Sequence, residues 1–231
     1  MSWLKNLFRF EKVIPPLPDT AYWQAYQQSF EQAYLKKTPL RYIRFVVLDT
    51  ETTGLDIKKD KILSIGAVAV KNQKIHIEDR FEYYVKQIYE GGKAGIKIHG
   101  ILPKHNVDAQ SPEKILIDLL AYLKNSVIVG HHIGFDFAVL NRAFQQHLGG
   151  QLRNKILDTA LLAKRVQSPF YNTNIDNNQP HSLDALCLQY DVPVYNRHTA
   201  GGDAIITALL FLKLMGKLEK RGIKRWGVLY G

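Results

Sequence analysis

Two carboxylates, Asp49 and Glu51, stand close together in the segment LDTETTG, residues 48–54. The residues before them, RYIRFVVL, are largely β-branched and apolar, which predicts a buried strand that ends near the turn at Thr53 and Gly54. Side chains two residues apart on a strand point to the same face. Burying two carboxylates side by side is costly unless a cation compensates, and a hard divalent cation suits oxygen ligands. The alternative is that both accept backbone hydrogen bonds where the strand turns.

Two further acidic residues stand at the starts of predicted helices. Asp136 lies in GHHIGFDF, residues 130–137, and Asp203 lies in HTAGGDAI, residues 198–205. Taken alone, Asp136 fits a helix-capping or helix-dipole residue. His198 precedes Asp203 by five residues, in a loop that would bring its side chain alongside. Four carboxylates at the ends of elements, each where a sheet crevice would form, together indicate a metal site.

The elements that position these residues alternate between strands and helices. After the first strand, residues 62–70 and 74–85 predict two more strands joined by a hairpin turn, and residues 127–129 predict a short buried strand. Helices are predicted at residues 112–123, 135–148, 182–190 and 202–218, and the polar residues 167–180 predict a loop. This order predicts an α/β domain with a central mixed sheet flanked by helices.

The amino-terminal residues form a predicted extension of different character. The segment VIPPLP, residues 13–18, cannot be helical, whereas residues from Asp19 or Thr20 to about Leu35 predict a helix. Aromatic residues spaced by four place rings on one face of that helix: Tyr22, Tyr26, Phe30 and Tyr34. This helix either docks on a partner or completes the core. The expected organisation is an extension over residues 1–41, a main domain over 42–216 and a basic tail over 217–231.

The charge of the chain favours a polyanionic partner. Lys and Arg outnumber Asp and Glu by 31 to 21, which gives a formal net charge of +10. The segment KLEKRGIKRW, residues 217–226, is densely basic and carries an aromatic residue. A basic surface attracts nucleic acid by counterion release, so nucleic acid is the favoured partner class. The alternative is a set of solvated lysines.

Composition also excludes some protein classes. No apolar run approaches the roughly 18 to 20 residues that span a bilayer. The amino terminus mixes Lys5 and Arg9 into its apolar positions, so neither a membrane partner nor a secretory signal is expected. The single cysteine, Cys187, excludes an internal disulfide. These features predict a cytoplasmic protein.

Taken in order, the acidic segments resemble the three motifs of the DEDD exonucleases, in the histidine-containing DEDDh branch. Asp49 and Glu51 match D-x-E-T-T-G, Asp136 matches F-D, and His198 with Asp203 matches H-x-A-x-x-D. Weaker similarity in IHGI (98–101), LDT (157–159) and HSLDAL (181–186) extends the resemblance over residues 42–216. The chain is similar to the epsilon-type proofreading exonucleases of bacterial replicative polymerases and their stand-alone relatives. The resemblance implies a ribonuclease H-like fold and hydrolysis of nucleic acid from its 3′ end to nucleoside monophosphates.

The same resemblance implies roles for the site residues. Asp49, Glu51 and Asp203 would bind one divalent ion, and Asp49 and Asp136 a second, with Mg²⁺ or Mn²⁺ as the ions that oxygen ligands select. His198 would be the general base, because its ordinary pKa suits proton transfer near neutrality.

Substrate contacts are implied at four positions. The backbone near Thr52, the side chain of Leu55 and His99 would border the terminal nucleotide. Phe135 either packs against a terminal base or fills the core. The expected substrate is single-stranded DNA or a frayed 3′ end.

Other functions fit the same residues. An RNA-trimming 3′–5′ exoribonuclease would use the same site, since nothing in the sequence decides the sugar. A catalytically silent nucleic-acid-binding or polymerase-associated scaffold subunit is the alternative from another class, and a DNA polymerase subunit is a candidate partner. The chain departs from the family pattern at His132, where Asn is common, and at Gly201 and Gly202, where a larger apolar residue is frequent.

Overall fold

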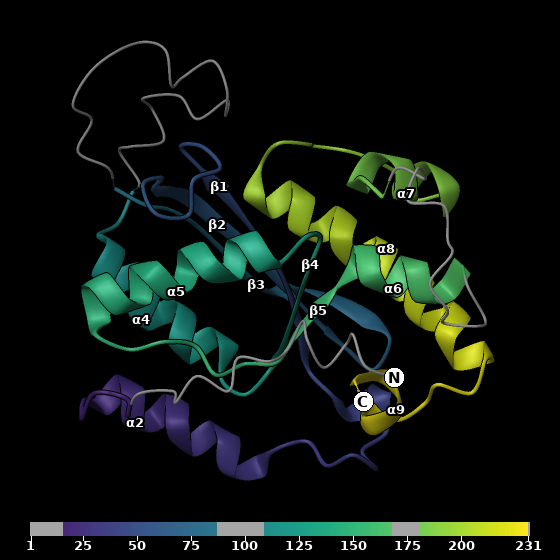
Figure 1. Cartoon of the computed structure of the whole chain (residues 1–231), viewed down its shortest axis with the longest axis horizontal. Coiled ribbons are helices and arrows are strands. Elements are labelled where there is room, and N and C mark those ends of the chain that lie inside the picture. Colours follow the sequence, from purple (N-terminus) through teal and green to yellow (C-terminus); the bar gives the residue numbers. More distant parts are fainter. Residues whose placement is uncertain (1–15, 87–108, 168–180, 231) are drawn as a thin grey trace.

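A mixed five-stranded sheet forms the centre of the computed structural model, which describes residues 16–86, 109–167 and 181–230 (Figure 1). The strands are β1 (Phe45–Thr52), β2 (Ile62–Lys71), β3 (Lys74–Tyr84), β4 (Val127–Gly130) and β5 (Ile156–Asp158). They lie in the order β3-β2-β1-β4-β5, with antiparallel pairing among β1, β2 and β3 and parallel pairing from β1 through β4 to β5. The predicted mixed sheet is confirmed. The sequence did not predict β5, which has only three residues.

The residues of β1 face alternately into two separate hydrophobic cores. Phe45 and Val47 belong to the core that contains helix α8 (Ala200–Lys220), whereas Val46 and Leu48 belong to the core that contains α5 (Gly134–Leu148). A strand that is covered on both faces has no polar face to alternate with, which explains its continuous apolar run. The direction of each later side chain follows from this alternation.

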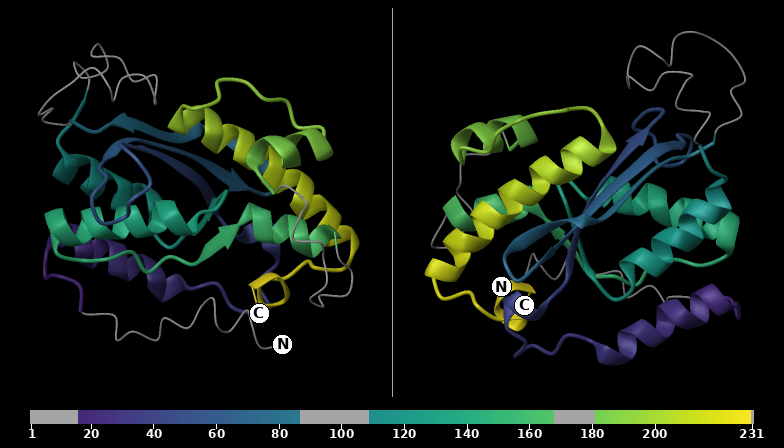
Figure 2. Two further views of the ribbon diagram at one scale, coloured as in Figure 1. Left: turned by 45° about the horizontal axis from the view of Figure 1, so that its top comes forward. Right: turned by 180° about the vertical axis from the view of Figure 1, so that it is seen from behind.

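Helices cover both faces of the sheet, as Figure 2 shows from two sides. α4 (Pro112–Leu123) and α5 cover one face, and α6 (Thr159–Gln167), α7 (Leu183–Gln189) and α8 cover the other. Ser111 caps α4 as predicted, since its hydroxyl accepts a hydrogen bond from the Lys114 amide at 3.3 Å. α5 ends at Gly149, which has a left-handed φ of 71°. The sequence did not predict α6, and the predicted loop over 167–180 lies outside the described residues except for Gln167.

The amino-terminal helix α2 (Ala21–Gln28) is shorter than predicted. The predicted continuation to about Leu35 is wrong, because the chain passes through the 3₁₀ turn η1 (Ser29–Gln32) into an extended residue at Ala33. Tyr34 then packs against the α8 core, which a straight helix anchored on the α5 core could not reach. Trp23 and Tyr26 are the buried residues of α2. The Trp23 indole donates a hydrogen bond to the Leu148 carbonyl at 2.9 Å.

The carboxyl-terminal residues are packed against the domain. α8 runs to Lys220, beyond the boundary expected at residue 216, and the short helix α9 (Trp226–Tyr230) follows. Trp226 and Leu229 are buried in the α8 core. Beside them lies the 3₁₀ turn η2 (Leu40–Tyr42), which leads into β1. No helix among the described residues is long and apolar enough to span a membrane.

Candidate active site

Asp49 and Glu51 lie at the carboxyl end of β1 and face the α8 side of the sheet. They continue the alternation of Phe45 and Val47, so they point away from α5. Asp49 is opposite Gly66 of β2. A side chain at Gly66 would overlap the backbone of Ala200 and Gly201. Its absence lets the first turn of α8 lie directly on β2 beside Asp49.

This close approach brings Asp203 to the two strand carboxylates. Asp203 is buried in the first turn of α8, where the Thr199 hydroxyl caps the helix by accepting a hydrogen bond from the Gly202 amide at 3.1 Å. One carboxylate oxygen from each of Asp49, Glu51 and Asp203 lies within 4.8 Å of the others. The structure therefore assembles three of the predicted metal ligands from two elements that are about 150 residues apart in the chain.

Asp136 reaches the same place from the opposite face of the sheet. Thr50 points toward α5, and its hydroxyl and amide donate hydrogen bonds to Asp136 Oδ1 at 2.7 and 2.9 Å. Asp136 stands in the first turn of α5 and is buried. It is thus held by the residue that lies between Asp49 and Glu51. Sequence spacing gives no indication of this contact, which depends on the packing of α5 on the sheet.

Burial and mutual repulsion disfavour the ionised forms of these acids. Burial, followed by the charges of Asp136, Asp203 and Glu51, holds the pKa of Asp49 well above its usual value. Burial raises the pKa of Asp136 to about 6, although the Thr50 hydrogen bonds oppose the rise. The pKa of Glu51 is raised by burial and by Asp203. A bound cation would relieve this repulsion, and oxygen-only ligands suit a hard divalent ion.

Comparison with known proteins agrees with this geometry. Residues 46–211 match the RNase T family, described as "Exonuclease". The chain belongs to this exonuclease family. The chain is 34% identical over 180 residues to a "DNA polymerase III PolC-type" protein of Caldanaerobacter subterraneus subsp. tengcongensis, covering 78% of this chain and 12% of that one. It is 33% identical over 199 residues to a "DNA polymerase III subunit epsilon-like protein" of Rhodobacter capsulatus, covering 85% and 27%. It therefore spans only a small part of these relatives.

The fold of the chain also matches solved structures. E. coli Exonuclease I in complex with a dT13 oligonucleotide superposes with a TM-score of 0.62 at 17% identity, over 78% of this chain and 42% of that one. The zinc-bound form of its complex with single-stranded DNA gives a TM-score of 0.63 at 18% identity, with the same shares covered. At this identity the likeness concerns the fold, and the expected ribonuclease H-like fold is confirmed.

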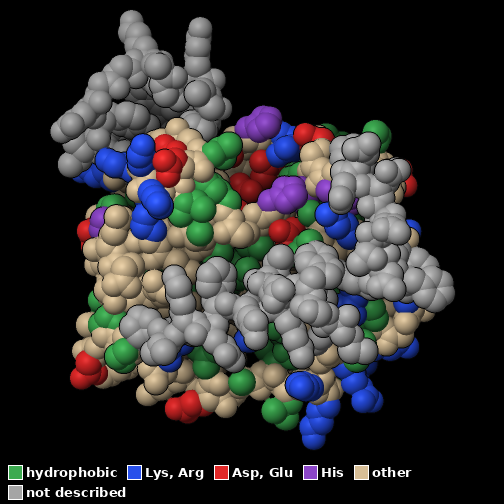
Figure 3. Space-filling view, viewed as in Figure 1, with side chains coloured by type: hydrophobic (Ala, Val, Ile, Leu, Met, Phe, Trp, Pro, Cys, Tyr) green, Lys and Arg blue, Asp and Glu red, His purple; other side chains and the backbone are tan. Residues whose placement is uncertain are grey.

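The structure places His198 beside the predicted metal ligands. Its amide donates a hydrogen bond to Asp203 Oδ2 at 3.3 Å, and its backbone has a left-handed φ of 62°. The ring is close enough for its charge to lower the pKa of Glu51. In the space-filling view, acidic side chains lie at the bottom of a hollow whose rim carries histidines (Figure 3). The general-base role of His198 remains a prediction.

Arg197 is a site residue that the sequence reasoning missed. Its Nε donates a hydrogen bond to Asp184 Oδ1 at 2.8 Å, and its Nη2 bonds Asp184 Oδ2 at 3.3 Å. Its Nη1 forms an ion pair with Asp203 Oδ1 at 2.5 Å. The side chain therefore links α7 to a metal ligand. Its place directly before His198 was the only signal in the sequence, and its partners become apparent only once α7 and α8 are packed.

The predicted substrate residues lie in different surroundings. Leu55 is 86% exposed, whereas Thr52 is buried and its hydroxyl donates a hydrogen bond to the Gly54 carbonyl at 2.6 Å. Phe135 is half-buried and packs against the α5 core. His99 lies outside the described residues. Binding roles for all four remain predictions.

The departures from the family pattern have structural explanations. His132 has a left-handed φ of 54°, a conformation that Asn and His adopt more readily than most residues, so His meets the same backbone requirement as the usual Asn. A side chain at Gly201 would overlap the Glu82 carboxylate, and one at Gly202 would overlap the Asn196 carbonyl. The glycine pair therefore belongs to the close packing that delivers Asp203.

Proposed function

We propose that this chain is a metal-dependent 3′–5′ exonuclease that hydrolyses nucleic acid, with single-stranded DNA or frayed 3′ ends as substrate, to nucleoside monophosphates. The observation that carries the proposal is the group of carboxylate oxygens from the half-buried Asp49 and Glu51 and the buried Asp203, which all lie within 4.8 Å of one another. It lies at a carboxyl strand end of an exonuclease-family domain. A silent scaffold would have no need for mutually repelling buried acids.

The residues present fit divalent ions. Asp49, Glu51 and Asp203 would hold one Mg²⁺ or Mn²⁺, and Asp136 with Asp49 would hold a second, because these donors are all carboxylate oxygens. The pKa values of Asp49 and Asp136 are raised first by burial and then by neighbouring acids, which a bound cation would offset. When bound, the ions supply charge neutralisation for the attacking and leaving oxygens of phosphodiester hydrolysis.

His198 and Arg197 have separate roles in this proposal. His198 takes a proton from the attacking water, and the hydrogen bond from its backbone amide to Asp203 holds its backbone beside the site. Arg197 is a positioning residue, since its pairing with Asp184 holds the guanidinium where it meets Asp203 Oδ1. Such a residue orients a metal ligand without touching the reacting atoms.

The substrate and pathway rest on the relatives. E. coli Exonuclease I has been solved with single-stranded oligonucleotides, and the curated relatives are named as DNA polymerase III proteins. We therefore propose a role in DNA replication or repair, with a polymerase subunit as candidate partner. The nuclease would occupy residues 42–216, with the extension 1–41 and the tail 217–231 beside it.

Digestion of a 5′-labelled single-stranded DNA, beside an RNA of the same sequence, tests the proposal. Each substrate is incubated with Mg²⁺, with Mn²⁺ and with chelator, using the native protein and Asp49→Asn. We expect a metal-dependent ladder that shortens from the 3′ end and a loss of at least about a thousandfold in the variant.

The outcomes separate the alternatives. Faster digestion of RNA than of DNA would replace the DNA exonuclease with an exoribonuclease. No cleavage of either strand with either metal would make the chain a binding subunit. Asp118→Asn, which removes a carboxylate on the surface of α4, is the matched control and should leave the rate unchanged.

A further inference from the structure

Two basic segments that are far apart in the sequence are joined at one end of the molecule. They are KKTPLR, residues 36–41, and KRGIKR, residues 220–225. The Leu40 amide donates a hydrogen bond to the Lys224 carbonyl at 3.0 Å. The amides of Trp226 and Gly227 donate to the Thr38 and Lys36 carbonyls at 2.9 and 2.8 Å. This backbone pairing fixes the two segments side by side, so their charges add on one surface.

The side chains of this surface are exposed and free of acidic partners. We call it the basic end, made up of Lys36, Lys37, Arg41, Lys220, Lys224 and Arg225, all of which are exposed. Neither segment contains Asp or Glu. Across the described parts of the chain, no ion pair engages any of the six. Concentrated cations without counter-charges on the protein attract a polyanion.

An exposed aromatic ring lies within the basic end. Tyr42 is 58% exposed, which is unusual for a large side chain in a turn that leads into a buried strand. The Arg41 guanidinium lies over its ring, 4.9 Å from the centroid. Cations that track phosphates, together with an aromatic face on which a base can stack, are the features that bind single strands without sequence preference.

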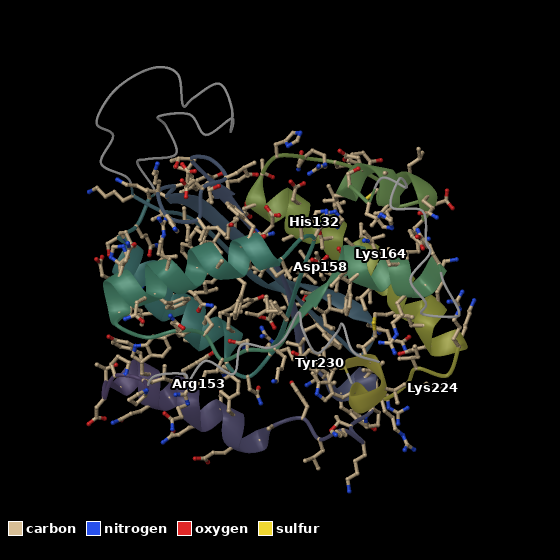
Figure 4. All side chains as sticks on the ribbon, viewed as in Figure 1. His132, Arg153, Asp158, Lys164, Lys224 and Tyr230 are labelled. Carbon is tan, nitrogen blue, oxygen red and sulfur yellow. The ribbon has the colours of Figure 1, made fainter. Side chains whose placement is uncertain are left out.

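The basic end is distinct from the active site. Asp203 lies in the first turn of α8 and Lys220 in its last, 17 residues later, so the two are about 25 Å apart at a rise of 1.5 Å per residue. Figure 4 labels Lys224 at the lower right, well away from His132 near the carboxyl ends of the strands. At about 3.4 Å per nucleotide, a stacked strand held at both places spans about seven nucleotides, and an extended strand spans the same distance with fewer.

We propose that the basic end is a second nucleic-acid-binding surface, which holds the sugar-phosphate backbone of the substrate strand upstream of the 3′ end in the active site. An anionic membrane would also be attracted by the charge. The stacking position at Tyr42 favours nucleic acid, because a base offers a ring face and a lipid headgroup does not. The proposal concerns binding, so it can be tested whether or not the protein cleaves.

The test compares strands of two lengths. Binding of oligo(dT) of about three and about thirty nucleotides, chosen to fall below and above the reach estimated from the helix, is measured in chelator by fluorescence anisotropy over a range of salt. The variants are Lys224→Gln/Arg225→Gln and, on the other segment, Lys36→Gln/Arg41→Gln. The control is Lys114→Gln/Lys124→Gln on α4, which removes the same charge from another surface. Thermal melts check that each variant is folded.

We expect each basic-end variant to weaken binding of the long strand about tenfold, to reduce the slope of log affinity against log salt by about one, and to leave binding of the short strand unchanged. Tyr42→Ala should weaken binding of the long strand by a similar factor. The control should match the native protein for both lengths.

Three results would overturn the proposal. The first is an equal loss for short and long strands, which would place the effect in the active site or the fold. The second is unchanged binding of the long strand, which would mean that the cations of the basic end are only solvated surface residues. The third is loss of binding to vesicles containing an anionic lipid with no loss for oligonucleotides. If the native protein binds the long strand through the basic end but cleaves nothing, the proposed function fails and this proposal stands.

Discussion

The two ends of α8 contrast in how they hold charge. The first turn buries Asp203 among other carboxylates, where glycine contacts and left-handed backbone positions fix the geometry. The last turn presents exposed cations with no acidic partner among the described residues. Chemistry on a phosphate needs atoms placed to within a fraction of an ångström, whereas attraction of a phosphate backbone needs only charge at the surface. Small structural changes at the first turn should therefore reduce activity, whereas binding at the last turn should weaken only when charges are removed.

Removal of the proposed base should slow the chemical step while the metal ligands stay in place. His198→Ala is expected to slow hydrolysis by at least about a hundredfold while metal binding changes little, because no ligand oxygen is lost. Single-turnover rates and a Mn²⁺ titration measure the two quantities. Lys224→Gln/Arg225→Gln should leave the single-turnover rate on a short strand unchanged. An unchanged rate in His198→Ala would remove this residue from the mechanism.

The free energy of unfolding of the metal-free protein should depend on pH through the carboxylates of the candidate active site. A carboxyl group whose pKa is higher in the folded than in the unfolded state lowers the free energy of unfolding once it ionises. This loss is absent below the unfolded pKa, grows as pH rises between the two pKa values, and is complete above the folded pKa. For Asp136, the rise from 3.8 to about 6 corresponds to roughly 3 kcal/mol.

Thermal melts in chelator between pH 4 and pH 8 measure this dependence. Asp136→Asn keeps an oxygen that can accept from Thr50, so it should be more stable than the native protein above pH 6 and should lose that advantage when Mg²⁺ is added. Asp118→Asn provides the comparison for an exposed carboxylate. Parallel curves of melting temperature against pH for all three proteins would contradict the inference that ionisation of Asp136 destabilises the metal-free fold.

The close approach of α8 to β2 should be sensitive to a single methyl group. Gly66→Ala would place a carbon against the Ala200 backbone, so we expect a loss of about 1 to 3 kcal/mol in the free energy of unfolding, together with reduced activity. Gly216 lies in α8 and has nothing within 4 Å of an added carbon. Gly216→Ala should therefore raise the free energy of unfolding by up to about 1 kcal/mol. Chemical denaturation measures both. Equal changes in the free energy of unfolding for the two variants would mean that α8 does not need to approach β2 so closely at Gly66.

The smallest expected effect concerns Arg197. Arg197→Lys keeps the charge but loses the forked contact with Asp184, so Asp203 should be held less firmly. We expect the Mn²⁺ concentration for half-maximal activity to rise about tenfold while the rate at saturating metal changes little. A fall in the saturated rate with unchanged metal dependence would instead place Arg197 in the chemical step.

Much of the fold and most of the site could be predicted from the sequence. The four acids were found because they stand together at the ends of predicted elements and match a family's motifs in order, and the strands of the leading hairpin were found from their composition. β5 was missed because three residues, Ile156–Asp158, are too few to show an alternating pattern. The end of α2 was missed because ring spacing does not show that Tyr34 crosses to the other core. Arg197 was missed because its partners come from a different helix.

The alternation of β1 between two cores has a consequence for when the enzyme becomes active. Asp49 and Glu51 meet Asp203 only after the α8 layer has docked, and Thr50 receives Asp136 only after the α5 layer has docked. The site therefore requires both halves of the molecule at once, and loss of either half leaves an incomplete set of ligands. During synthesis Asp203 is the last of the four acids to leave the ribosome. If the proposed function holds, a growing chain would not cut nucleic acid until α8 has been made and has packed on the sheet.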